Sequence, residues 1–132
     1  MLGELLGESR GKRIVRRALS SDPPKVEVSF EDSGKMLGTD TNGFGTYVAV
    51  VRPDGTLFGE GNGAMVSQDG DMISWTGYGL GKFKEHGVVS YRGILFFRTA
   101  SEKLARLNSV GGVFEYDVDS EGNTHSKVWE WK

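Results

Sequence analysis

Residues 59–81 read GEGNGAMVSQDGDMISWTGYGLG, a stretch that is rich in glycine at both ends. Side chains of a β-strand alternate between its two faces, so glycine at every second position leaves one face of a strand bare. Asp69-Gly70, in the middle, is a typical dipeptide of a two-residue hairpin loop. We therefore predict a hairpin with strands over 56–68 and 71–83, whose glycines permit the strong coiling that a small barrel needs. The alternating glycines are Gly59, Gly61, Gly63, Gly77, Gly79 and Gly81.

The rest of the chain also has a hydrophobic period of two, which predicts β-strands rather than helices. Eight or nine such strands suit a single closed antiparallel meander β-barrel of about eight strands, an all-β fold that removes exposed strand edges. TASEKLARLN (99–108) contains helix formers, and we expect one short helix near residues 100–108 that covers one end of the barrel. The predicted strands are 25–31, 35–40, 43–52, 56–68, 71–83, 87–99, 110–119 and 123–132, with 11–19 as a further candidate.

Length and composition indicate one domain over residues 1–132. Residues 1–24 fit either a strand of the barrel or a peripheral N-terminal arm, since the basic segment 10–19 could be a strand or an amphipathic helix. The net charge of −2 gives no general attraction to nucleic acid or to an anionic membrane. No signal-like segment or apolar run of membrane-spanning length is present, so we expect a cytoplasmic protein.

The chain offers little of the chemistry that metals and cofactors require. It has no cysteine and only two histidines, and no carboxylates are paired at a spacing typical of zinc or calcium sites. The GEGNGA and GYGLGK strings match a dinucleotide motif only loosely, because no strand-to-helix junction follows them. We therefore expect no cofactor and no metal, and we assign no catalytic residue.

A two-residue loop at Asp69-Gly70, together with Phe83 paired to Val88 across the KEHG loop (84–87), would set Glu60, Gly79 and Arg92 in one row across three strands. The glutamate and the arginine would then lie about 9–10 Å apart by strand spacing, with only hydrogen on the residue between them. If they point inward, this buried pair and Asn62 are candidate contacts for a polar group of a ligand. If they point outward, they form a surface or interface ion pair of modest value.

Neither face of the predicted sheet is polar, so the sequence does not decide which face is inside. The face opposite Glu60 carries an alternative set of ligand-binding residues, which would line the interior if that face is inward: Tyr47, Tyr78 and Tyr91. Whichever face is outward would expose apolar side chains, and self-association is the simplest way to cover them. We therefore predict a homo-oligomer.

Three strings carry a family resemblance: GTYVAVVRPDGTLFGEGNGAMVSQDGDMISWTGYGLGKF, YRGILFFRTASEKLARLN and VFEYDVDSEGNTHSKVWEWK. From about residue 25 to the end, the chain resembles a family of small, uncharacterised prokaryotic proteins, which implies no particular activity. By strand rhythm and glycine use it is more distantly similar to barrels of the allene oxide cyclase and dirigent type. That similarity implies eight antiparallel strands, frequent oligomers and an apolar cavity for a lipid-like or phenolic compound.

Three functions follow from these expectations, and the sequence leaves open whether the protein is an enzyme. The first is a non-enzymatic barrel that binds a small, mostly apolar molecule in its interior. The second is an isomerase or cyclase of the allene oxide cyclase type, and the third is a filled barrel that acts as an oligomeric structural or interaction module. A cavity of ~300 Å³ or more would favour the first two, and a solid interior would eliminate them.

Overall fold

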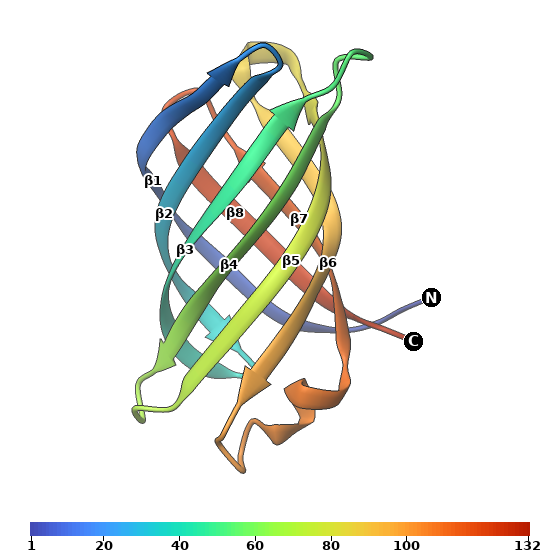
Figure 1. The fold of residues 1–132 in the computed structure, drawn as a ribbon. Helices are drawn as coiled ribbons and strands as arrows, with labels where there is room; N and C mark the ends of the chain where they lie inside the picture. Colours follow the sequence, from blue (N-terminus) through green and yellow to red (C-terminus); the bar gives the residue numbers. More distant parts are fainter.

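The computed structural model describes all residues, Met1–Lys132, and confirms a closed eight-stranded antiparallel barrel (Figure 1). Each strand pairs with the next along the chain, and β8 returns to pair with β1. No helix is long and apolar enough to cross a membrane. The strands are β1 Leu2–Ser21, β2 Pro24–Met36, β3 Thr39–Val51, β4 Leu57–Ser67, β5 Met72–Phe83, β6 Val89–Thr99, β7 Gly111–Val118 and β8 Asn123–Trp131, with short 3-10 helices η1 Glu85–Gly87 and η2 Ala105–Ser109.

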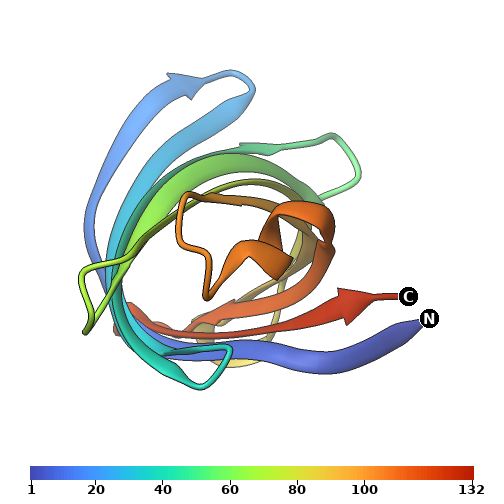
Figure 2. The ribbon, with the colours of Figure 1, turned by 90° about the horizontal axis from the view of Figure 1, so that it is seen from below.

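The N-terminal segment, which the sequence left open, supplies the first strand of the barrel. β1 pairs with β8 only as far as Lys12, and beyond that residue it pairs with β2 alone. The β1–β2 hairpin therefore projects past the wall, as Figures 1 and 2 show. The predicted separate strands 25–31 and 35–40 are wrong, because β2 continues without a break to Met36. The turn comes at Leu37 and Gly38, both with positive φ.

The register of the β4–β5 hairpin differs by one residue from the prediction. The Gly70 N–H donates to the Ser67 carbonyl, and the Ser67 N–H donates to the Asp71 carbonyl. Gly70 has a φ of +87°, so Gln68-Asp69-Gly70 forms a three-residue loop with glycine in the left-handed position. A one-residue shift moves every side chain of a strand to the other face. The predicted face of β5 is therefore wrong.

In the observed register, all six alternating glycines face the barrel interior, with Gly59 opposite Gly79 and Gly61 opposite Gly77. Large rings occupy the space that these glycines leave. A Cβ atom on Gly63 would lie 2.6 Å from the Trp75 ring. Bare strand faces thus let an eight-stranded barrel hold several aromatic side chains, besides permitting its curvature.

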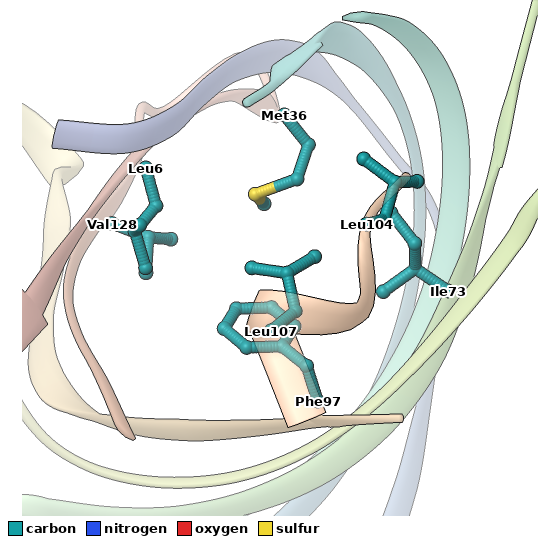
Figure 3. Packing of buried hydrophobic residues seen from close by; sticks show 7 residues of the cluster. All are labelled: Leu6, Met36, Ile73, Phe97, Leu104, Leu107 and Val128. Carbon is teal, nitrogen blue, oxygen red and sulfur yellow. The ribbon is translucent and has the colours of Figure 1, made fainter. Parts of the chain in front are cut away.

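One end of the barrel is closed by the segment between β6 and β7, as expected, although its helix is a single 3-10 turn, η2 (Figure 2). Leu104 and Leu107 point inward and are almost fully buried. Asn108 ties the segment to the end of β6, because its side chain accepts from the Thr99 N–H at 2.8 Å and donates to the Thr99 carbonyl at 3.0 Å. Figure 3 shows the resulting plug, which consists of Leu6, Met36, Ile73, Phe97, Leu104, Leu107 and Val128.

Candidate functional site

The predicted row of Glu60, Gly79 and Arg92 does not form, because two predicted registers are each wrong by one residue. The β4–β5 loop is one residue longer than expected, and Phe83 pairs with Val89 rather than with Val88. Glu60 lies opposite Tyr78, and both Glu60 and Arg92 belong to the outer face of the barrel. Arg92 forms its ion pairs with Glu115 at 3.6 Å and Asp117 at 3.8 Å. Exposed pairs of this kind contribute little to stability. The expected Glu60–Arg92 pair is therefore wrong in its geometry.

The other predicted ligand-binding residues divide between the two faces. Asn62 and Tyr78 belong to the outer face, and Tyr78 is 50% exposed. Tyr47 and Tyr91 point into the barrel, where their rings lie 5.6 Å apart. Of the predicted residues, only these two tyrosines come together in the interior.

The interior contains a cavity of about 120 Å³ above the plug. This is less than the ~300 Å³ set out from the sequence, yet the interior is not solid. An apolar cavity of ~150 Å³ is known to admit benzene, so this volume suits a molecule of about that size or smaller. The inward-pointing residues of its lining include six aromatic ones, Phe30, Tyr47, Trp75, Tyr91, Phe114 and Tyr116, and four polar ones, Ser9, Asp32, Thr41 and Ser126.

Three tyrosines form one side of this cavity. The ring of Tyr116 lies 5.9 Å from that of Tyr47 and 6.1 Å from that of Tyr91. Burial raises the pKa of all three phenols, so each keeps its proton at neutral pH. The Tyr116 hydroxyl is buried without a hydrogen-bond partner, although the Tyr47 hydroxyl is nearby. The cavity therefore contains an unsatisfied polar group.

Asp32 is the partly buried carboxyl group of the site. It points inward from β2, and its neighbours across the sheet are Gly11 of β1 and Gly43 of β3. A Cβ atom on Gly43 would lie 2.6 Å from Asp32 Oδ1, so glycine makes room for the carboxyl group there. The Ser9 hydroxyl donates to Asp32 Oδ2 at 3.1 Å and shares a 2.7 Å hydrogen bond with Ser126.

Burial raises the pKa of Asp32, and the hydrogen bond from Ser9 opposes the shift only in part. No lysine or arginine lies close enough to Asp32 to form an ion pair or to lower this pKa. A carboxyl group removed from water without a cation nearby is unusual, because it costs free energy of folding. Groups with a perturbed pKa are concentrated at functional sites.

Sequence reasoning missed Asp32 and Tyr116. Asp32 fell between the two predicted strands 25–31 and 35–40, so it was assigned to a turn. The alternation of Val28, Phe30 and Asp32 was the signal that could have placed it on the inner face. Tyr116 lay on a predicted strand, but nothing in its neighbours distinguished it from an ordinary core residue.

A larger hollow of about 310 Å³ lies outside the barrel. Glu60 is the only predicted ligand-binding residue that borders it, and it contains no buried polar atom without a partner. No three metal-ligating side chains gather anywhere in the protein. The interior cavity is therefore the best candidate site. The residues around the outer hollow are Ser20, Pro23, Lys25, Val48, Val50, Phe58 and Glu60.

The fold and the cavity together define a small barrel with an aromatic interior. Solved proteins share its fold. A protein of unknown function from Clostridium acetobutylicum has a TM-score of 0.85 and 17% identity over 96% of both chains. A conserved protein of unknown function from Rhodopseudomonas palustris has a TM-score of 0.81 and 13% identity over 98% of this chain and 97% of its own. An enzyme from Penicillium herquei has a TM-score of 0.69 and 17% identity, covering 96% and 92% of the two chains.

These similarities show the fold alone, because the identities are low. No protein-family model and no curated protein matches the sequence. The expected resemblance to small, uncharacterised barrel proteins is supported at the level of structure, whereas the descriptions of these structures do not show a similarity to allene oxide cyclases.

Proposed function

We propose that the protein binds a small, mostly apolar molecule inside the barrel. The observation that carries this proposal is the aromatic cavity with a buried Tyr116 hydroxyl that has no partner. Leaving such a group unsatisfied costs free energy, which a ligand with a matching polar atom would recover. Tyr47 and Tyr91 supply further ring surface, and the volume restricts the ligand to about the size of benzene.

Cyclopentanol is a suitable probe because it combines a small apolar ring with one hydroxyl. Its dissociation constant is measured by titration followed in amide NMR spectra. Leu95→Phe enlarges a cavity-lining side chain and should weaken binding at least ~tenfold. Ile94→Phe makes a comparable enlargement on the outer face and serves as the matched control. Equal affinities in both variants, or shifts confined to outer-wall amides, would contradict the proposal.

The alternative is an isomerase or cyclase of the allene oxide cyclase type, and the partly buried Asp32 favours it. The raised pKa of each interior tyrosine keeps it protonated, so these groups can donate but not accept a proton at neutral pH. Asp32 would be the proton acceptor, and one barrel of this shape is described as an enzyme. Isomerisation of cyclopentene oxide, followed by NMR and lost in Asp32→Asn with binding retained, would favour catalysis over binding alone.

The outer wall supports a further proposal, that a second copy of the chain covers it. Tyr78, Leu80 and Phe96 are each at least half exposed on neighbouring strands β5 and β6. Glu60 forms no ion pair within the chain, and Arg92 lies on the same wall, so a two-fold axis would bring opposite charges together. Sedimentation velocity at micromolar concentration should show a dimer or larger assembly that Leu80→Arg dissociates, and a monomeric native protein would contradict this.

A further inference from the structure

We propose that the interior ligand is a small organic ammonium ion, with its N–H groups on Asp32 and Tyr116 and its alkyl part against the aromatic rings. This inference rests on the proposed binding function and specifies the chemical class of the ligand. Three features of the cavity support it: the charge balance around Asp32, the arrangement of rings, and the number of free acceptors.

The charge balance favours a cation. The Asp32 carboxylate accepts one hydrogen bond, from Ser9, and contacts no positively charged side chain. A buried charge is tolerated when it is paired, and removing both partners from water is less costly when they meet in good geometry. The arginines that approach the cavity, Arg13 and Arg16, act on Tyr47 rather than on Asp32. When Asp32 is ionised, a cationic ligand would supply the positive charge that the protein does not provide.

The ring arrangement favours the same class of ligand. Phe30 lies 5.6 Å from Tyr116, and it stacks on Trp75 at 6.3 Å, measured between ring centroids. Phe30 precedes Asp32 by one inward position on β2, so the carboxyl group lies next to this aromatic layer. The face of an aromatic ring attracts a cation within about 6 Å, and the attraction is greater when the cation is desolvated.

The two free oxygens of the site can both accept from one ammonium ion. Asp32 Oδ1 accepts no hydrogen bond within the protein, and the Tyr116 oxygen has no partner. An alcohol can donate its O–H to Asp32 and accept from the Tyr116 O–H, but it brings no positive charge to the carboxylate. A primary ammonium has three N–H groups and can donate to both. Charge-assisted hydrogen bonds of this kind are also the stronger ones.

The experiment compares two probes of nearly equal size, cyclopentylammonium chloride and cyclopentanol, at pH 7 and constant ionic strength. Amide NMR titration of the native protein should give an ammonium affinity at least ~tenfold higher than that of the alcohol, as expected for a hydrogen-bonded charge. Asp32→Asn should abolish this preference and leave cyclopentanol binding within about threefold. Glu31→Gln removes an exposed carboxylate on the outer face of the same strand and should leave both affinities unchanged, which makes it the matched control.

A second measurement needs no variant and therefore holds even if Asp32→Asn fails to fold. Lowering the pH from 7 to 4 protonates much of Asp32, because its pKa lies above 3.8, and should weaken cyclopentylammonium binding but not cyclopentanol binding. Ammonium affinity that stays constant between these pH values would overturn the inference.

The outcomes also separate this inference from the proposed function. Cyclopentanol binding as tightly as cyclopentylammonium, or more tightly, would overturn the ammonium assignment and leave the binding function intact. Failure of both probes to bind would overturn both. Ammonium binding that survives in Asp32→Asn but falls in Glu31→Gln would move the cation to the outer wall and refute the assignment.

Discussion

Replacing Tyr116 with phenylalanine should stabilise the empty barrel. The substitution removes only the buried hydroxyl that lacks a partner and keeps the ring, which packs against Phe30, Tyr47 and Tyr91 at centroid distances of 5.6, 5.9 and 6.1 Å. An unsatisfied buried hydroxyl costs about 1–3 kcal/mol. We expect the free energy of unfolding to rise by about 1–2 kcal/mol, since nearby polarisable rings recover part of that cost.

The size of the corresponding thermal shift follows from the length of the chain. Unfolding entropy is about 2.1 cal/mol/K per residue, which for 132 residues gives roughly 0.28 kcal/mol/K. A gain of about 1–2 kcal/mol therefore raises the Tm by about 4–7 °C. Calorimetry measures this shift directly, and urea unfolding followed by tryptophan fluorescence gives the free energy independently.

Tyr78→Phe is the matched control, because Tyr78 is half exposed on the outer wall and its hydroxyl reaches water. Its free energy of unfolding should change by less than about 0.5 kcal/mol. If Tyr116→Phe is neutral or destabilising while the control is neutral, the Tyr116 hydroxyl is already satisfied, by water or by Tyr47. The cavity would then contain no unsatisfied polar group, contrary to the proposal.

Three further predictions concern the carboxyl group, the glycines and the plug. Because the pKa of Asp32 is raised from 3.8, the native state binds the Asp32 proton more tightly than the unfolded state does. The stability relative to Asp32→Asn should therefore be greatest below pH 3.8 and be lost as the pH rises through the folded-state pKa. Urea unfolding across about pH 3–8 measures this dependence. Gly63→Ala places a methyl group 2.6 Å from an indole ring and should cost about 1–3 kcal/mol, whereas Gly59→Ala meets its nearest atom at 3.4 Å and should be neutral or slightly stabilising. Leu107→Ala should lower the free energy of unfolding by about 2–5 kcal/mol, measured in urea. Leu19→Ala, on the projecting hairpin, should lower it by less than about 1 kcal/mol. Equal losses would mean that η2 does not seal the barrel.

The barrel could be predicted from the sequence because strand period, turn chemistry and glycine placement all agree on one fold. The register of β4 and β5 could not, because Asp69-Gly70 suits a two-residue loop and also the last two positions of a three-residue loop. Only the observed hydrogen bonds of Ser67 distinguish the two. That single residue moved Tyr78 outward and Trp75 inward, and it separated Glu60 from Arg92.

The site was harder to predict than the fold for a different reason. Both faces of the sheet are apolar, one because it lines the cavity and the other because it carries exposed residues such as Leu80 and Phe96. Hydrophobic alternation identifies an inner face only when the outer face is polar. Tyr47 and Tyr91 were nevertheless placed on one face, because a second one-residue error, in the pairing of β5 with β6, cancelled the first: Phe83 pairs with Val89 rather than with Val88.

Stability and function oppose each other at Asp32 and Tyr116, and this opposition distinguishes a site from a packing defect. A defect costs stability without return, so its removal should leave every other property unchanged. At a site, Asp32→Asn and Tyr116→Phe should each stabilise the empty barrel at neutral pH and weaken binding of cyclopentylammonium. At a concentration of 100 times its Kd, the ammonium ion would stabilise the native barrel by about 2.7 kcal/mol. The same concentration would stabilise either variant by less. Variants that gain stability and keep their affinity would identify both groups as faults of packing, and the cavity as empty space.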